Sequence, residues 1–347
     1  MTGLADRLRA QAVQCGLHGS PLTATLLAGA GDDYDAGGPT AELLGPHEDD
    51  PEGSVPGLRL AGALHRLVLE RRAAELALYY PSVGGTAGPA GSWEVARRTV
   101  TEQLDTLRTE VRRPVQTNEV GRSAVLYGGC LQVAALTGKP LRLLEIGASA
   151  GLNLMVDRFA YEIADDRVLG DPVSPVRLVR PWVGSPPIVP LEIRARAGCD
   201  PAPLDPGRTQ DQLTLTSYVW ADQLDRFERL RAALRLAARY GVPVEALPAS
   251  RFLARELARP TPGVATVVWH SVVWQYLDRA ERAAVQEILA AAAARATPAA
   301  PLAHLSLEPE RVGDGPFRFP VELTAWPGGE TRALAKAKGH GPPVRWA

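Results

Sequence analysis

The segment LLEIGASAGLNL, at positions 143–154, constrains the fold of this chain more than any other feature. It joins an apolar stretch that begins at Leu141 to a turn made only of Gly, Ala and Ser, and a helix-compatible segment from Leu152 to Phe159 follows. The pattern predicts a buried strand, a tight turn and the start of a helix. Small residues let a ligand approach the backbone of such a turn, where the N–H groups of the helix start are unpaired. A phosphate-binding dinucleotide turn would need G-x-G-x-x-G with an acidic residue further on, and that spacing is absent.

Composition narrows the class of protein. The 347 residues are 46% hydrophobic and 22% charged, with a net charge of -1, which is typical of a globular protein that binds neither nucleic acid nor an anionic membrane. The three cysteines are too scattered for a disulfide framework or a zinc cluster, so we expect no metal and a cytoplasmic location. No signal peptide or membrane-spanning stretch is expected.

The order of the expected elements predicts two regions. Residues 1–115 are expected to form a helical region or lid, and residues 116–347 an α/β domain with a mostly parallel sheet and an antiparallel C-terminal end. The Pro-rich stretch 171–206 is expected to be an insertion or lid. Helices are expected at 58–79, 93–112, 118–136, 222–239 and 279–294, and strands at 142–146, 161–163, 191–195, 264–269, 304–307 and within 317–346.

Glu145 and the turn after it resemble the first motif of S-adenosylmethionine (SAM)-dependent methyltransferases, an acidic residue followed by G-x-G-x-G. Ser149 takes the place of the middle glycine. The resemblance implies a Rossmann-type sheet with SAM bound at the turn. The residues that it implies for the cofactor are Glu145, Gly147, Ser149, Gly151 and Asn153, with Asp165 for the ribose hydroxyls.

A closer resemblance covers most of the chain. The runs NEVGR at 118–122, YVWADQ at 218–223 and VWHSVVWQY at 268–276, with the terminal HGPPVRW at 340–346, are similar to an actinobacterial family catalogued as domain of unknown function 2332. The combination of motifs is specific. It implies a methyltransferase-like fold and no established reaction.

Ligands of open α/β sheets bind outside the carboxyl ends of the strands. If 142–146 and 264–269 are neighbouring strands, His270 and the residues around it lie beside the turn. His270 is the candidate general base, with a hydrogen-bonded structural histidine as the alternative. Glu308, at the end of the strand 304–307, is a candidate second acid. The residues expected to shape the acceptor pocket are Trp269, Ser271, Trp274 and Tyr276.

Two further groups are candidates for substrate binding. Asn118 and Arg122 are four residues apart on one expected helix face, with Glu119 adjacent, and Arg122 could clamp a carboxylate or a sulfate. A helix cap and a surface ion pair are the alternative roles. Trp220 and Arg226 mark the start of another helix and could face a ligand.

Three functions remain open from the sequence. The first is methyl transfer from SAM to a small molecule, with His270 as base. The second keeps the fold without the cofactor and promotes an intramolecular displacement or elimination in a natural-product precursor, for example nitrogen-ring closure with loss of sulfate. The third is a non-catalytic subunit that supports a partner protein. A small partner subunit or a homo-oligomer is compatible with all three.

Overall fold

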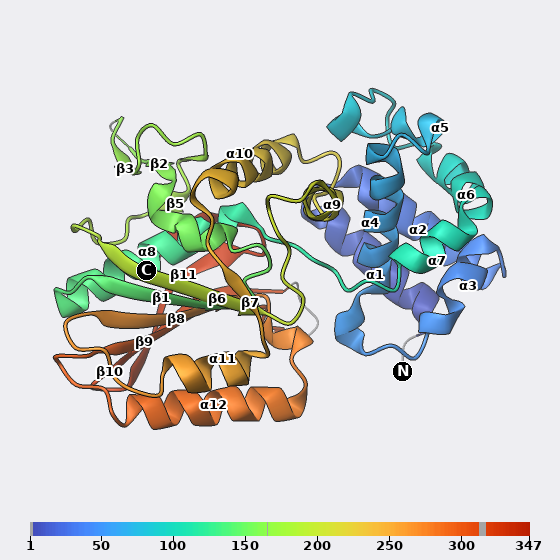
Figure 1. The fold of residues 1–347 in the computed structure, drawn as a ribbon. Helices are drawn as coiled ribbons and strands as arrows, with labels where there is room; N and C mark the ends of the chain where they lie inside the picture. Colours follow the sequence, from blue (N-terminus) through green and yellow to red (C-terminus); the bar gives the residue numbers. More distant parts are fainter. Residues whose placement is uncertain (1–2, 165, 312–316) are drawn as a thin grey trace. The chain divides into compact units, whose positions relative to one another are not determined.

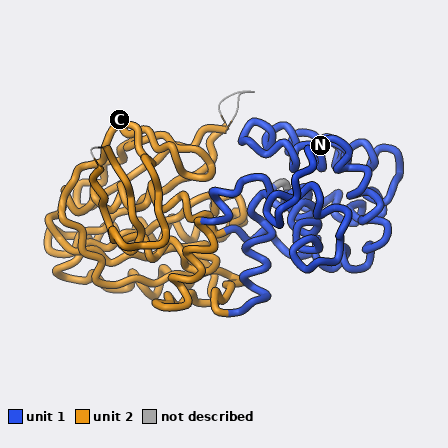
Figure 2. The backbone as a smooth tube through the Cα atoms, turned by 90° about the horizontal axis from the view of Figure 1, so that it is seen from above, with its two compact units in different colours: residues 1–117, 208–228 blue, residues 118–207, 229–347 orange. Residues whose placement is uncertain are grey.

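The computed structural model describes residues 3–164, 166–311 and 317–347, and the chain folds into two compact units (Figure 2). Unit 1 comprises residues 1–117 and 208–228, and unit 2 comprises residues 118–207 and 229–347. The sequence predicts a boundary at 115 and assigns everything after it to the α/β domain. In the structure, residues 208–228 belong to the helical unit; they are called the returning segment below.

Unit 1 is built from helices around an apolar core. One of them, α4, carries a leucine-rich face that is fully buried, as at Leu60, Leu64 and Leu67, because residues three and four apart share one side of a helix. The expected helices 58–79 and 93–112 are each divided in two. The elements are α1 (Leu4–Leu17), α2 (Pro21–Asp35), α3 (Pro39–Leu44), η1 (Gly45–His47), η2 (Glu52–Ser54), α4 (Pro56–Leu69), α5 (Ala74–Ala77), η3 (Pro81–Val83), α6 (Ser92–Glu102), α7 (Leu104–Glu110) and α9 (Thr209–Ser217).

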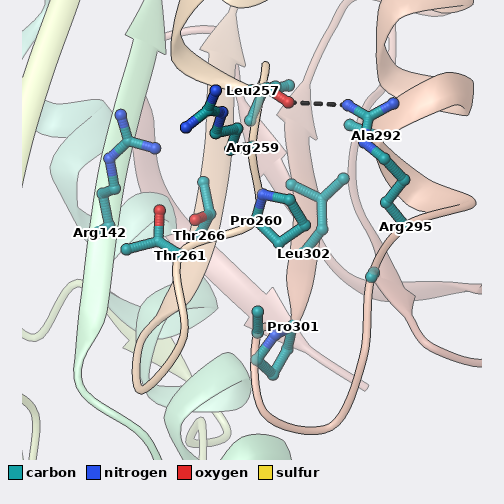
Figure 3. Close-up of a pocket in the computed structure, with 12 residues that line it drawn as sticks. Arg142, Leu257, Arg259, Pro260, Thr261, Thr266, Ala292, Arg295, Pro301 and Leu302 are labelled. Atoms are coloured by element: carbon teal, nitrogen blue, oxygen red, sulfur yellow. Dashed lines mark hydrogen bonds between the residues drawn. The ribbon is translucent and has the colours of Figure 1, made fainter.

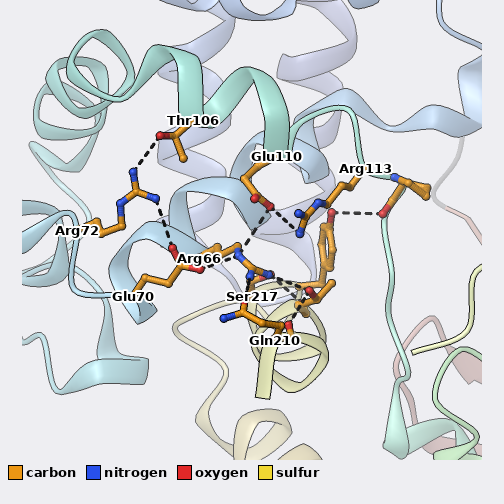
Figure 4. A network of polar contacts seen from close by, with 11 residues as sticks. Arg66, Glu70, Arg72, Thr106, Glu110, Arg113, Gln210 and Ser217 are labelled. Carbon is orange, nitrogen blue, oxygen red and sulfur yellow. Dashed lines mark hydrogen bonds and ion pairs between the residues drawn. The ribbon is translucent and has the colours of Figure 1, made fainter. Parts of the chain in front are cut away.

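Polar contacts hold the returning segment to the other helices of unit 1. Arg66 of α4 donates to the hydroxyl of Thr214 in α9 at 2.8 Å, within a network of arginines and glutamates (Figure 4). Asp222 accepts the N–H of Leu22 at 3.0 Å and the hydroxyl of Ser20 at 2.6 Å. Because the first N–H groups of a helix have no partner within it, Asp222 caps α2 from far along the chain.

Unit 2 contains a nine-stranded, mostly parallel sheet in the order β5-β12-β11-β10-β9-β8-β1-β6-β7. The chain runs outward from β1 through β6 to β7 and then crosses to β8 and β9 on the other side of β1. The point of reversal therefore lies between β1 and β8. The strands are β1 (Leu141–Ile146), β5 (Trp182–Val183), β6 (Ile193–Asp200), β7 (Val244–Ala246), β8 (Ala265–Ser271), β9 (Leu302–Leu307), β10 (Phe319–Trp326), β11 (Glu330–Lys338) and β12 (Gly341–Trp346).

Helices cover the two faces of this sheet. On one face, α8 packs so closely that a Cβ at Gly129 would lie 2.3 Å from Leu305 of β9, so glycine is required there. The other face is covered by α11 and α12, at the bottom of Figure 1, whose apolar residues share one core with Leu144 and Val268. The remaining elements are η4 (Val120–Arg122), α8 (Ser123–Thr137), η5 (Leu152–Arg158), α10 (Leu224–Tyr240), α11 (Ala249–Glu256), η6 (Trp274–Tyr276) and α12 (Arg279–Ala293).

The mixed α/β class, the mostly parallel sheet and its antiparallel end are confirmed. Two details of the prediction are wrong. The strand expected at 161–163 joins a separate sheet of β3 (Val168–Gly170), β2 (Ala160–Glu162) and β4 (Arg177–Val179). The stretch 171–206 contains β6, a direct neighbour of β1, so it is not only an insertion. The helix expected after the turn is present as the 3-10 helix η5, which is kinked at Met155.

Candidate functional site

The carboxyl ends of β1 and β8 meet at one edge of the sheet, as the sequence predicts. The two strands are parallel neighbours, and Glu145 lies opposite Trp269. Beyond the strands the two loops touch, because a Cβ built on Gly147 would lie 2.3 Å from a methyl group of Val273. Gly147 also has a φ of 67°, a conformation that other residues rarely adopt.

The alternation of side chains along the strands divides the predicted site between the two faces of the sheet. Val268 packs in the core under α11 and α12, so His270, two residues on, projects to that same face. Trp269, between them, and Glu145, directly opposite it, project to the other face. The sheet therefore separates the side chain of His270 from that of Glu145, although both strands end at the same edge.

On the face covered by α12, a chain of three ionisable side chains runs from β8 to β9. The Nδ1 atom of His270 lies 2.7 Å from Oε1 of Glu308, and its Nε2 atom lies 2.9 Å from Nε2 of His304. His270 is only 3% exposed, whereas His304 and Glu308 are partly exposed. His304 was missed from the sequence. The sequence does carry a signal for it, because polar residues stand at every second position, at His304, Ser306 and Glu308, in and just after an otherwise apolar strand.

When both rings are uncharged, these contacts assign a donor or acceptor role to each ring nitrogen. A carboxylate oxygen of Glu308 accepts the Nδ1–H of His270, which leaves the neutral His270 ring with a lone pair on Nε2. That lone pair accepts the Nε2–H of His304, so the accepting nitrogen at the end of the chain is Nδ1 of His304. Burial, with the nearby His270, lowers the pKa of His304 to about 3, so its ring is neutral at pH 7.

Glu308 also anchors the loop that follows β8. Its two carboxylate oxygens accept the N–H groups of Val273, at 3.0 Å, and of Trp274, at 3.2 Å. Val272, just before them, has a φ of 53°, which is an unusual conformation for a β-branched residue. The indole of Trp274 in turn stacks on the His270 ring, with centroids 5.1 Å apart. Such a backbone conformation costs free energy and persists only where surrounding contacts hold it in place, as the contacts to Glu308 do here. Strain of this kind is common at functional sites.

On the opposite face, Glu145 is a buried carboxyl group at the end of β1. It is 2% exposed, and its Oε2 atom has no hydrogen-bond partner among the described residues. Burial raises the pKa of Glu145 to about 8, against the opposing influence of the neighbouring Trp269 indole and the Arg122 guanidinium. The group is therefore mostly protonated at pH 7.

The small-residue turn uses its own N–H groups within the protein. Asn118 Oδ1 accepts the N–H of Ala150 at 3.2 Å and that of Leu152 at 2.9 Å. Asp200, at the end of β6, accepts the N–H of Ser149 at 3.0 Å. The N–H groups of 148 and 151 bond to backbone carbonyls. The N–H groups of Ser149, Ala150 and Leu152 are thus bonded within the protein, and Val273 lies against Gly147.

The other predicted site residues have varied surroundings. Asn118 does not cap the helix that follows, because it bonds to the turn, and Glu119 caps η4 by accepting the N–H of Gly121. Asn153 donates to the Glu119 carbonyl, but its own Oδ1 is buried without a partner. Arg122 donates to the carbonyls of Ser271 and of 339 and so joins two loops, and its role as an anion clamp stays a prediction.

The remaining predicted residues lie elsewhere or cannot be placed. Tyr276 is 47% exposed in η6. Trp220 and Arg226 belong to unit 1, where the Arg226 guanidinium lies 5.5 Å from the indole ring of Trp220. Asp165 lies outside the described residues. At the same edge of the sheet, Asp200 ends β6, the strand next to β1.

Across the described ranges, no cluster of His, Cys, Asp and Glu could hold a metal ion, and no helix is long and apolar enough to cross a membrane. The match to a family model covers residues 5–346, which is nearly the whole chain. The chain belongs to this family. The family is described as an uncharacterized protein conserved in bacteria (DUF2332). No curated protein and no solved structure matches the chain.

Proposed function

We propose that this chain is an enzyme that removes a proton from a small molecule, with His304 as the base and His270 and Glu308 as its relay. The observation that carries the proposal is the unbroken chain of hydrogen bonds from the Glu308 carboxylate through both rings to Nδ1 of His304. The candidate base thus moves from His270, whose two ring nitrogens are both engaged, to a histidine that is partly exposed.

The relay explains how a histidine with a lowered pKa can accept a proton. When Nδ1 of His304 takes a proton from the substrate, its Nε2 proton passes to Nε2 of His270. The positive charge then rests on the His270 ring beside the Glu308 carboxylate, where it is stabilised by a charge-assisted hydrogen bond. Because the two rings share the proton, the pKa that governs the reaction belongs to the pair and not to His304 alone.

Of the two reactions that the sequence leaves open, the cofactor-independent one is the better supported. Removal of a proton from an amine or hydroxyl allows that atom to attack a neighbouring carbon, and the bond to a leaving group on that carbon breaks. The leaving anion carries away the electron pair. The occupied N–H groups of the turn and the contact between Gly147 and Val273 support this reaction over transfer from SAM.

Calorimetry separates the two reactions. Purified protein is titrated with SAM and with S-adenosylhomocysteine, and Gly147→Arg serves as the control for a site at the turn. We expect no binding to the wild-type protein up to about 1 mM, a free energy weaker than about −4 kcal/mol. A micromolar Kd that is lost in Gly147→Arg would establish a cofactor site at the turn and overturn the preference for a cofactor-independent reaction.

The relay is tested by conversion of metabolites. A bacterial small-molecule extract is incubated with the wild-type protein and with His304→Gln, His270→Gln and Glu308→Gln, with His47→Gln as a matched control in unit 1. We expect at least one compound to be consumed by the wild-type and control proteins. His304→Gln and His270→Gln should lower this conversion by about 100-fold or more, as for loss of a general base. Equal conversion by all folded variants would refute the relay, and no conversion by any protein would favour the non-catalytic subunit.

A further inference from the structure

A pocket lies at the amino-terminal edge of the parallel strands in unit 2, opposite the edge that holds the proposed relay. It is lined by residues that begin β1, β8 and β9, by the end of α12 and by the segment that precedes β8 (Figure 3). Its empty volume is about 320 Å³, including the space open to solvent. From Thr266 in the pocket to His270 is four residues of one strand, or about 13 Å, so the pocket is separate from the proposed relay.

The charge of this pocket is one-sided. Its twelve lining residues include Arg142, Arg259 and Arg295 but no aspartate or glutamate. Arg142 is paired with Glu256, which lies outside the lining, and Arg295 donates to the carbonyl of Leu257 at 2.9 Å. Arg259 makes no hydrogen bond or ion pair with any residue that the structure describes. Each guanidinium has five N–H donors, so all three retain donors beyond these contacts.

Two hydroxyl groups add neutral donors between the cations. Thr261 and Thr266 lie side by side in the pocket, with Arg142 and Arg259 beside them (Figure 3). Thr266 is 6% exposed, and its hydroxyl has no hydrogen-bond partner among the described residues. The Thr266 hydroxyl is not among the fully buried unpartnered groups, so it is open to a ligand oxygen that accepts its hydrogen bond.

We infer that this pocket binds a small tetrahedral oxyanion of the phosphate class. Guanidinium groups match the geometry of phosphate oxygens through paired N–H donors, and a threonine hydroxyl can donate to a further oxygen. Of the three guanidinium groups in the pocket, Glu256 balances the charge of Arg142 alone. A bound anion neutralises the remaining positive charge. An uncharged ligand would leave the repulsion between the guanidinium groups in place.

The test is calorimetric titration with inorganic phosphate at pH 7.5, at an ionic strength held constant with chloride. The variants are Arg259→Gln and Thr266→Val, and Arg251→Gln is the matched control, since Arg251 is exposed on α11 and does not line the pocket. We expect saturable binding by the wild-type and control proteins. Arg259→Gln should raise the Kd about tenfold or more, and Thr266→Val about threefold to tenfold, as for loss of charged and neutral donors.

The outcomes separate the sources of the oxyanion. Glycerol 3-phosphate that binds as tightly as phosphate identifies a phosphomonoester, and weaker binding of the ester identifies the free ion. No saturable binding of phosphate at 20 mM overturns the inference, as does an unchanged Kd in folded Arg259→Gln. Because Arg259 is exposed, that variant is expected to unfold at the wild-type temperature. The result does not depend on the proposed relay, because it requires no conversion of a substrate.

Discussion

The buried carboxyl of Glu145 makes the stability of the protein depend on pH. Its pKa is about 8 in the folded protein, because burial disfavours the charged form, against an ordinary value of 4.5. The folded protein therefore keeps this proton from pH 4.5 to 8, whereas the unfolded chain has lost it. The contribution of this proton to the free energy of unfolding is complete below pH 4.5. It is lost as the pH rises from 4.5 through 8, at about 1.4 kcal/mol per pH unit. The loss is about 3 kcal/mol at pH 7 and about 5 kcal/mol above pH 8.

Glu145→Gln isolates this contribution, since glutamine has the shape of the protonated glutamate and no ionisable proton. We expect the two proteins to be about equally stable near pH 5. The free energy of unfolding of the variant, relative to that of the wild type, should then rise by about 1.4 kcal/mol per pH unit up to pH 8. Urea unfolding followed by tryptophan fluorescence at pH 5, 6, 7 and 8 measures the difference. A difference between the two proteins that stays constant with pH would refute the assignment of a raised pKa to Glu145.

Two other changes act on stability through named contacts. Burial lowers the pKa of His65 to about 4. The contribution of the neutral His65 ring to the free energy of unfolding is therefore complete above pH 6.5 and is lost as the pH falls to 4, by about 3 kcal/mol in total. Urea unfolding of the wild-type protein and His65→Gln at pH 7 and 4.5 should show this dependence only in the wild type, and equal slopes would contradict it. Asn118→Ala leaves the buried N–H groups of Ala150 and Leu152 without an acceptor, so we expect a loss of about 2–4 kcal/mol in thermal unfolding. Asn118→Asp keeps the acceptor oxygen and should lose less, so equal losses would refute this role.

Much of unit 2 follows from short-range patterns in the sequence. The apolar runs before Glu145 and before His270 each predict a strand at a position that the structure confirms, because a strand buried on both faces has few polar residues. Their adjacency also follows, once the turn is read as the first of an α/β sheet. For the C-terminal end the sequence predicts a strand, a turn at Pro327, Gly328 and Gly329, a short polar segment and a final strand, whereas in the structure the polar segment is the strand β11, paired with both β10 and β12.

The site is less predictable, because it depends on which face of a strand each side chain occupies. Placing His270 at the end of β8 is not enough, since a shift of one residue moves a side chain to the other face of the sheet. The link between His270 and His304 depends on the register of two strands that are separated by a whole helix. The acceptor role of Asn118 is also long-range, since it bonds to N–H groups more than thirty positions away.

The discontinuity of unit 1 has a consequence for the order of events on the ribosome. The chain completes β1 and β6 of the large sheet before it supplies the returning segment, and the carboxylate that caps α2 belongs to residue 222 of 347. Domains usually fold as they emerge, N-terminal first. Here the helical unit stays unfinished until well over half of the protein has been synthesised. A fragment that stops at residue 117 therefore lacks part of its own structure and is a poor choice for expression, whereas one that ends after residue 228 contains every segment of that unit.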